Sequence, residues 1–299
     1  MLTRKQLDER KSGLGGSDAP VALGLSQWRT PLDLYMEKIG VPVAVNQETE
    51  RMRWGSVLEP VIADEWASRT GKRILAVDTQ RHPTLPFLLG NVDRLIEGED
   101  AGLEVKTTSG SAVSEWGEEW TDQVPLYYLV QVYHYAAVTG RRTWYFAVLC
   151  NGSELRTYVV QTRDDLLAEI VERERVFWEC VQTRRPPRPQ SPEDAARLFP
   201  VSRSITVEAS TEVLAAVVHL RECREAITDI AADIAGAETT IKAYMGEADT
   251  LTFAGSTLAT WRSAKPTQRI DLDALRLRAP KTAARYTITG EASRRFLLK

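Results

Sequence analysis

Two strand-like stretches separated by a short polar turn constrain this chain more than any other feature. The first is residues 90–96, Gly-Asn-Val-Asp-Arg-Leu-Ile, and the second is residues 101–107, Ala-Gly-Leu-Glu-Val-Lys-Thr. Two such runs on either side of a turn are typical of a β-hairpin. Residues two apart on a strand share a face, so Glu104 and Lys106 point to the same side. The hairpin therefore predicts that Asp93 lies beside Glu104.

Asp93, Glu104 and Lys106 form a set of side chains that suits a divalent cation. Two carboxylates that converge on one point supply the oxygen ligands that Mg²⁺ prefers. A neighbouring ammonium group can orient a water molecule or offset charge that develops on a phosphate. The plainer interpretation is a solvated hairpin with a surface ion pair, which contributes little. The apolar Val105, which points to the opposite face, favours a metal site over that interpretation.

The composition is that of a soluble globular protein without a strong overall charge. The 299 residues are 43% hydrophobic and 26% charged, and the formal net charge is −3. Residues 262–299 carry ten Lys and Arg against three Asp and Glu, so this tail alone is +7. The chain as a whole is thus no basic nucleic-acid coat, and any DNA binding must be local.

The cysteines and the hydropathy exclude several classes of protein. Cys150, Cys180 and Cys223 form no Cys-x-x-Cys pair, so a zinc site, an iron–sulfur cluster and a disulfide framework are not expected. No apolar run is long enough to span a bilayer, and the N-terminus lacks the apolar core of a signal peptide. These features predict a cytoplasmic protein that does not contact a membrane.

The order of predicted elements indicates an α/β fold in which a mixed sheet is flanked by helices. Turn and capping residues delimit helices at about 57–70, 125–138, 163–182 and 211–245. Strands are expected at about 73–77, 87–96, 102–107, 142–150, 154–161, 250–253 and 257–261. Asn151-Gly152 between two of these strands is a strong hairpin signal.

The proline content divides the chain. Residues 184–192 contain four prolines, which favour an extended connector. We therefore predict an α/β domain over residues 1–183, a proline-rich linker over residues 184–204, and a C-terminal extension over residues 205–299. The extension is predicted to hold the long helix, a short hairpin and the basic tail.

Several ordered motifs in the first domain resemble the YqaJ/lambda-exonuclease family of phage recombination nucleases. The resemblance covers about residues 5–182. It is carried by Arg10, Gly15-Gly16-Ser17-Asp18-Ala19, Trp28-Arg29-Thr30-Pro31-Leu32, Gly55-x-x-x-Glu59-Pro60, Asn91-Val92-Asp93, Glu104-Val105-Lys106 and Gln131-x-x-x-Tyr135. The resemblance implies a PD-(D/E)XK core of the restriction-endonuclease type.

The resemblance also implies roles for particular residues. Asp93, Glu104 and the carbonyl of Val105 would bind Mg²⁺, for which Mn²⁺ can substitute, and Lys106 would position or help deprotonate the attacking water. Two further side chains are added to the catalytic set: Glu59, as a further acidic ligand, and Gln131, as a support for the lysine or the phosphate. A helix-surface carboxylate and a satisfied core amide are the plainer interpretations of these last two.

Arg10 and Ser17 are candidates for a phosphate pocket. Ser17 follows a glycine loop and is a plausible N-cap of a short helix, where free N–H groups attract anions. The resemblance implies that such a pocket holds the 5′-terminal phosphate of DNA. An N-cap serine beside an unrelated surface arginine is the alternative.

The function implied by the resemblance is a Mg²⁺-dependent 5′→3′ double-stranded DNA exonuclease of phage or prophage recombination. Such an enzyme leaves a 3′ overhang for a single-strand annealing protein, and its relatives assemble into homo-oligomeric rings around DNA ends. Two alternatives remain open at this point. One is a structure-specific PD-(D/E)XK endonuclease, and the other is a DNA-end-binding module without turnover.

Overall fold

The computed structural model describes residues 12–41, 49–288 and 294–298. The chain divides into two compact units, Met1–Leu198 and Phe199–Lys299. The two units are described separately below. Among the described residues, no helix is long and apolar enough to cross a membrane.

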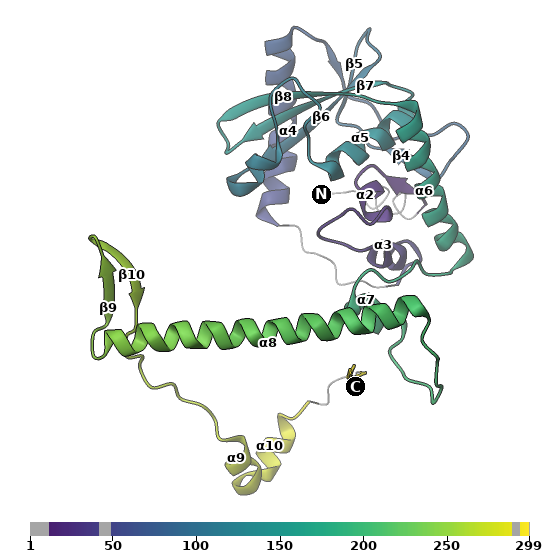
Figure 1. Ribbon diagram of the computed structural model, residues 1–299. Helices are drawn as coiled ribbons and strands as arrows, with labels where there is room; N and C mark the ends of the chain where they lie inside the picture. Colours follow the sequence, from purple (N-terminus) through teal and green to yellow (C-terminus); the bar gives the residue numbers. More distant parts are fainter. Residues whose placement is uncertain (1–11, 42–48, 289–293, 299) are drawn as a thin grey trace. The chain divides into compact units, whose positions relative to one another are not determined.

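A five-stranded mixed sheet forms the centre of the first unit (Figure 1). Its strand order is β2-β5-β6-β7-β8, in which β6 and β7 are parallel and the other neighbours are antiparallel. The strands are β2 (Ile74–Leu75), β5 (Arg94–Ile96), β6 (Ala101–Thr108), β7 (Thr143–Cys150) and β8 (Glu154–Gln161). The mixed sheet flanked by helices confirms the predicted fold class.

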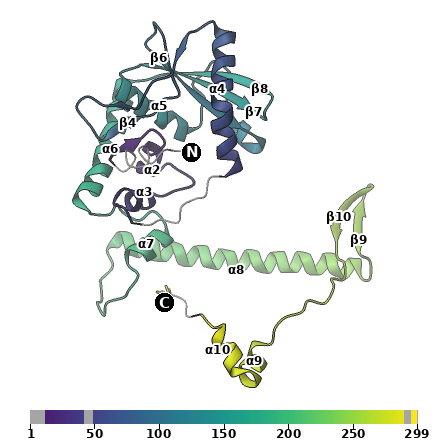
Figure 2. The ribbon, with the colours of Figure 1, turned by 180° about the vertical axis from the view of Figure 1, so that it is seen from behind.

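Helices cover both faces of this sheet. Helix α4 (Glu50–Thr70) lies on one face, while α5 (Leu126–Thr139) and α6 (Asp164–Thr183) lie on the other (Figures 1 and 2). Helix α5 stands in the crossover between the parallel strands β6 and β7, a connection that two-residue turns cannot make. Because both faces are covered, the interior strand β7 reads Thr-Trp-Tyr-Phe-Ala-Val-Leu-Cys, a nearly continuous apolar run.

Two apolar clusters hold the helices to the sheet. On one face, Ile62 and Trp66 of α4 pack with Leu103 and Val105 of β6. On the other face, residues of α5 and α6 pack with residues of β7 and β8; they include Val132, Tyr133, Ala136, Phe146, Tyr158 and Ile170. Strand β6 therefore has an apolar face toward α4, and its other face, with Glu104, is turned toward α5.

A smaller three-stranded sheet lies against the C-terminal half of α5, which contacts it through His134 and Val138. It consists of β1 (Leu14–Gly15), β4 (Leu88–Gly90) and β3 (Gln80–Arg81), in the order β1-β4-β3. Helices α2 (Ala19–Ala22) and α3 (Pro31–Lys38) follow β1. Helix α3 begins at a capping box in which Thr30 and Asp33 each accept a hydrogen bond from the other's backbone N–H.

The proline-rich segment is not extended throughout. Helix α7 (Pro192–Leu198) forms within the predicted linker of residues 184–204 and belongs to the first unit. Its buried Asp194 accepts hydrogen bonds from the Thr30 hydroxyl at 2.9 Å and from the Gln190 backbone N–H at 3.1 Å. This long-range contact fixes the segment against α3, which proline content alone cannot reveal.

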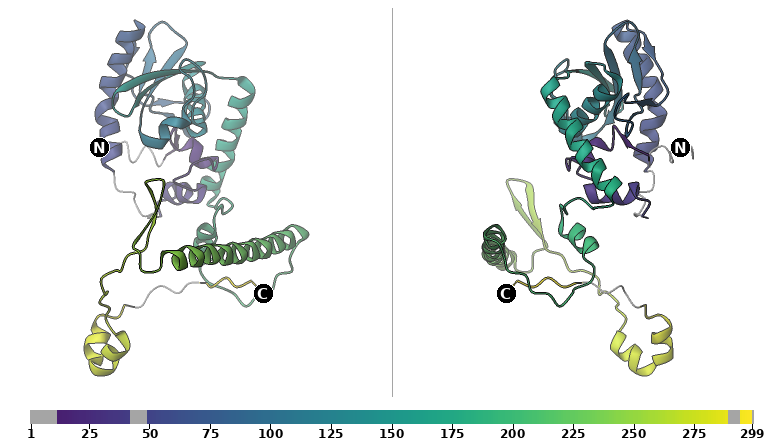
Figure 3. Two further views of the ribbon diagram at one scale, coloured as in Figure 1. Left: turned by 60° about the vertical axis from the view of Figure 1, so that its left-hand side comes forward. Right: turned by 90° about the vertical axis from the view of Figure 1, so that its right-hand side faces the viewer.

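The second unit contains one long helix and several short elements (Figure 3). Helix α8 (Thr211–Met245) is capped by Ser210, whose hydroxyl accepts from the backbone N–H of Val213. The hairpin of β9 (Thr250–Phe253) and β10 (Ser256–Thr260) follows directly at its C-terminal end. Helices α9 (Leu272–Arg278) and α10 (Pro280–Arg285) lie within the basic tail.

Candidate metal centre

The β5–β6 hairpin sets Asp93 beside Glu104. Arg94 pairs with Leu103 in antiparallel register, so the next pair outward is Asp93 and Glu104. The Asp93 Oδ2 accepts a hydrogen bond from the backbone N–H of Val105 at 2.7 Å. This bond holds the Asp93 carboxylate against β6 and explains why it meets Glu104.

Glu104 and Lys106 point to the same face of β6. The Lys106 ammonium donates a hydrogen bond to Glu104 Oε1, and it also lies 4.7 Å from the centre of the Tyr128 ring. Contact with a ring face stabilises a cation that has lost water. Glu104 is only 2% exposed, so its carboxylate is bound by protein groups and not by bulk solvent.

A chain of hydrogen bonds from α5 supports Glu104. The Gln131 amide Nε2 donates to Glu104 Oε1 at 2.7 Å and to the Tyr135 hydroxyl at 3.0 Å. The Tyr135 hydroxyl in turn donates to the backbone carbonyl of Asn91 at 2.9 Å. Gln131 and Tyr135 lie one helical turn apart, which is the spacing that places them on one face. These hydrogen bonds tie α5 to both sides of the hairpin, at Asn91 and at Glu104.

Burial and nearby negative charges make the two carboxylates costly in the charged form. Burial, and then the charge of Glu104, raises the pKa of Asp93 well above its usual value. Burial also raises the pKa of Glu104, against the opposing charge of Lys106. Burial alone would lower the pKa of Lys106, but the charges of Glu104 and Asp93 hold it above its usual value. The centre therefore has more negative charge than Lys106 alone compensates.

The residues of this centre fit a hard divalent cation. Glu104 Oε2 is buried and has no hydrogen-bond partner among the described residues, so this oxygen is available to bind a metal ion. A cation there would also relieve the repulsion between Asp93 and Glu104. Within the described part of the chain, no three Asp, Glu, His or Cys side chains gather as a metal cluster. The third protein ligand would accordingly come from the main chain, and the Val105 carbonyl is the candidate.

A family model described as a YqaJ-like viral recombinase domain matches residues 6–142. Residues 6–142 are therefore similar to that domain. The matched range contains Asp93, Glu104, Lys106, Gln131 and Glu59, so the whole candidate centre lies in the YqaJ-like domain.

Two similar proteins extend this comparison. The uncharacterized protein YqaJ of Bacillus subtilis (strain 168) is 43% identical over 176 residues, which are 58% of this chain and 54% of that protein. The match thus spans about half the length of the curated relative. The crystal structure of an alkaline exonuclease from Laribacter hongkongensis has a TM-score of 0.50 at 17% identity, covering 61% of this chain and 94% of that chain. This second likeness shows a shared lambda-exonuclease-like fold.

Glu59 of the YqaJ-like domain lies near the carboxylate pair but is engaged elsewhere. Its Oε1 accepts from the Arg94 guanidinium at 3.1 Å. The charge of Glu59 nevertheless adds to the raised pKa of Asp93 and of Glu104, so it lies within electrostatic reach of both. The sequence analysis did not single out Arg94. Its only signal was its position directly after Asp93, and a partner on α4 cannot be read from that.

Of the two residues predicted to form a phosphate pocket, the structure describes only Ser17. Arg10 lies outside the described residues. Ser17 is exposed, and Asp18, not Ser17, is at the N-cap of α2, with no side-chain cap bond. The prediction of Ser17 as the cap was wrong because Asp18 folds back: its Oδ2 accepts from the Gly15 backbone N–H at 3.1 Å and from the Lys38 ammonium at 2.7 Å. The start of α2 therefore already has an anion beside it.

A second buried ion pair links α5 to α6. The His134 Nδ1 is 2.6 Å from Glu174 Oε1 on α6, and its Nε2 is 2.9 Å from the Leu89 carbonyl oxygen. Burial alone would lower the pKa of His134, but Glu174 raises it above its usual value. Both side chains are fully buried. We interpret the pair as a structural link between α5, α6 and β4.

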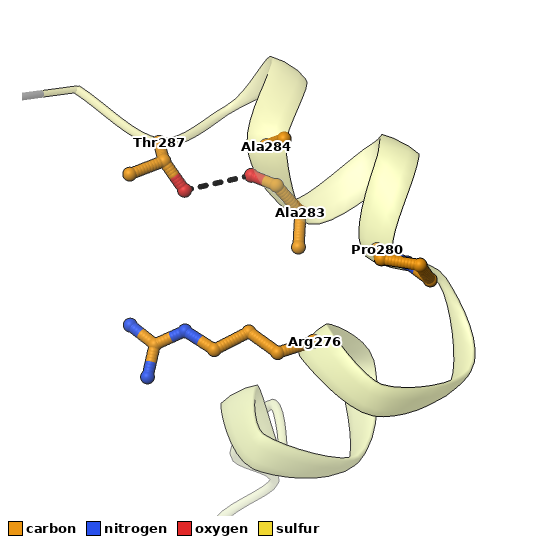
Figure 4. A pocket seen from close by; sticks show the side chains of 5 residues that line it. All are labelled: Arg276, Pro280, Ala283, Ala284 and Thr287. Carbon is orange, nitrogen blue, oxygen red and sulfur yellow. Dashed lines mark hydrogen bonds between the residues drawn. The ribbon is translucent and has the colours of Figure 1, made fainter.

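A cavity of about 440 Å³ lies in the second unit, between α9 and α10 (Figure 4). Its lining is Arg276, Pro280, Ala283, Ala284 and Thr287, and the Thr287 hydroxyl donates to the Ala283 carbonyl. It contains no carboxylate, histidine or cysteine, so it offers neither metal ligands nor an acid–base pair. The candidate site is therefore the buried centre of the YqaJ-like domain and not this open hollow.

Proposed function

We propose that the protein is a Mg²⁺-dependent 5′→3′ double-stranded DNA exonuclease of phage or prophage recombination. The observation that carries the proposal is the half-buried Asp93 beside the buried Glu104, with Lys106 hydrogen-bonded to Glu104, inside the range that matches a YqaJ-like viral recombinase domain. The enzyme would act in the cytoplasm of a bacterial host. It would leave a 3′ overhang for a single-strand annealing protein, and it would encircle the DNA end as a homo-oligomeric ring.

The proposed metal ligands are Asp93, Glu104 and the Val105 carbonyl, with Glu59 as a further ligand. When bound there, Mg²⁺ or Mn²⁺ would polarise the scissile phosphate and acidify water. Glu59 holds Arg94 through Oε1, so its Oε2 is the oxygen that would join the metal.

The remaining groups hold the substrate and the ligands in place. The raised pKa of Lys106 keeps its ammonium charged at neutral pH, so it can donate to the attacking water and to the phosphate. Gln131 fixes Glu104 through its amide, and Tyr135 fixes Gln131. These bonds orient the carboxylate before substrate arrives, and such preorganisation lowers the cost of reaching the transition state.

Digestion of three duplexes tests the proposal: linear DNA with a 5′-phosphate, linear DNA with a 5′-hydroxyl, and closed circular DNA. We expect nucleotides to be released from 5′ ends in Mg²⁺, no release in EDTA, and intact circles. Cleaved circles would instead support a structure-specific endonuclease. End binding without cleavage in either Mg²⁺ or Mn²⁺ would support a non-catalytic DNA-end-binding module.

Matched variants locate the activity. Glu104→Ala should abolish cleavage because a ligand is lost, whereas Glu97→Ala removes an exposed carboxylate from the turn of the same hairpin and should cleave normally. Equal activity of Glu104→Ala and Glu97→Ala at saturating Mg²⁺ would show that the metal site lies elsewhere.

A further inference from the structure

Helix α8 presents an apolar seam with an exact seven-residue period. Each seven-residue repeat (heptad) contributes two residues to the seam, three positions apart, which are called a and d below. The a positions are Val213, Leu220, Ile227, Ile234 and Ile241, and the d positions are Ala216, Cys223, Ile230, Ala237 and Tyr244. A stripe that repeats every 3.5 residues, and not every 3.6, is the signature of helices that wind around each other.

This seam is exposed within its own unit. Ile227 is 66% exposed, Ile230 is 57% exposed and Tyr244 is 82% exposed. Among the described residues of α8, only Met245, at the end of the helix, is buried. Exposed isoleucines in a continuous row are costly in water, since each buried one contributes roughly 1.5–3 kcal/mol. The seam therefore requires a partner.

The length of the seam limits what the partner can be. From Val213 to Tyr244 the seam runs about 46 Å at 1.5 Å per residue. The next longest helices of the described chain are α4, with 21 residues, and α6, with 20, so neither is long enough to cover the whole seam of the 35-residue α8. Within the described ranges, only another α8 matches the seam in both length and period. We propose that α8 pairs with α8 of a second copy of this chain, in an antiparallel coiled coil.

The side-chain sizes select the antiparallel direction. When two seams run in opposite directions, each a position faces a d position of the other copy. The resulting layers are Val213 with Tyr244, Ala216 with Ile241, Leu220 with Ala237, Cys223 with Ile234, and Ile227 with Ile230. Three of these five layers combine a large residue with a small one, Ala or Cys, and this is how helix layers interlock without gaps. In a parallel pair each d position faces itself, so two Ala–Ala layers would leave space that nothing fills.

The charges beside the seam agree with this direction. In a parallel pair, Asp233 would face Glu238 of the second copy, and the two-fold axis would repeat this repulsion. In the antiparallel pair, Asp233 faces Ala226 and Glu238 faces Val217. The reversed pair thus avoids a like-charge contact that the parallel pair makes twice. The two-fold axis passes between Ile227 and Ile230, and the same surface is used on both copies.

The mass of the full-length protein in solution tests the pairing. By light scattering, the wild type should contain an even number of 33.5 kDa chains, and Ile227→Lys should reduce that mass by half. Val218→Lys is the matched control, because Val218 is an exposed β-branched residue on the opposite side of α8. It should keep the wild-type mass. A monomeric wild type would overturn the proposal and would mean that the seam docks on its own chain. A mass of Ile227→Lys equal to that of the wild type would also overturn it.

Disulfide mapping tests the direction independently of nuclease activity. In the antiparallel pair, Cys223 faces Ile234, so mild oxidation of Ile234→Cys should link Cys223 to the introduced cysteine of the second copy. The two native Cys223 residues would lie about 16 Å apart along the helix axes, beyond the ~7 Å limit for Cα atoms of a disulfide. Dimers linked through Cys223 to Cys223 in the oxidised wild type would overturn the antiparallel arrangement.

Discussion

Replacing Asp93 by asparagine should stabilise the protein without metal and remove its response to metal. Glu104 is buried and Asp93 beside it is half-buried, and the pKa of each is raised by desolvation and by the other negative charges nearby. The amide oxygen of asparagine can still accept the hydrogen bond from the Val105 N–H. The substitution therefore removes a charge while leaving the packing and that bond in place.

The expected gain follows from the charges. Two charges about 4 Å apart repel by about 4 kcal/mol at an effective dielectric constant of 20. Lys106 and proton uptake relieve much of this repulsion, so we expect a net gain of about 1–2 kcal/mol in Asp93→Asn. For a unit of roughly 200 residues, each kcal/mol shifts Tm by about 2–4 °C, so Tm should rise by about 2–8 °C in EDTA.

In saturating Mg²⁺ the wild type should have a higher Tm than Asp93→Asn, the reverse of their order in EDTA. A ligand at 100 times its Kd stabilises the folded state by about 2.7 kcal/mol, and only the wild type retains both carboxylates. Thermal unfolding of both proteins in EDTA and in saturating Mg²⁺ measures the crossing, with Glu97→Gln as the control for loss of an exposed carboxylate. A lower Tm of Asp93→Asn in EDTA, or an equal Mg²⁺ response in both proteins, would refute the reasoning.

Three further predictions concern other groups. Lys106→Met should keep DNA affinity in Ca²⁺ but lose single-turnover cleavage, because its charge acts as the transition state develops; an equal loss of affinity and rate would make it a binding residue. Glu174→Ala should lower the free energy of unfolding by about 3–5 kcal/mol, whereas the exposed control Glu172→Ala should not. The loss should be largest below about pH 6.5 and should shrink as the pH rises through the raised pKa of His134. Thermal unfolding of both variants at pH 6 and pH 9 measures it. Arg10→Ala should slow digestion of 5′-phosphorylated but not 5′-hydroxyl duplex; an unchanged preference would place the phosphate pocket elsewhere.

Local chemistry was sufficient to predict most of the elements. The β7–β8 hairpin follows from Asn151-Gly152, both of which have positive φ, the conformation that this turn requires. The meeting of Asp93 and Glu104 follows from the two-residue period and the register of one hairpin. By contrast, α4 begins at Glu50, ahead of the predicted start near residue 57, because Thr49 caps it with a hydroxyl that accepts from Met52 N–H.

The contacts that sequence reasoning missed join residues far apart in the chain. Glu59 and Arg94 come from different elements, and His134 meets Glu174 across 40 residues. Asp194 reaches Thr30 across 164 residues and turns part of a predicted linker into a packed helix. None of these partners leaves a periodic or capping signal in the sequence, since each depends on how whole elements pack.

The central claim is that the Asp93–Glu104 pair of this chain supports metal-dependent cleavage of DNA ends. The most direct measurement is single-turnover cleavage of a 5′-labelled linear duplex by the wild type and by Glu104→Gln, in Mg²⁺ and at saturating enzyme. Glutamine keeps the size of the side chain and can still receive the Gln131 and Lys106 hydrogen bonds on its amide oxygen. The account predicts rapid cleavage by the wild type and a loss of at least about 100-fold in Glu104→Gln, with DNA affinity unchanged. Comparable rates for the two proteins would contradict it.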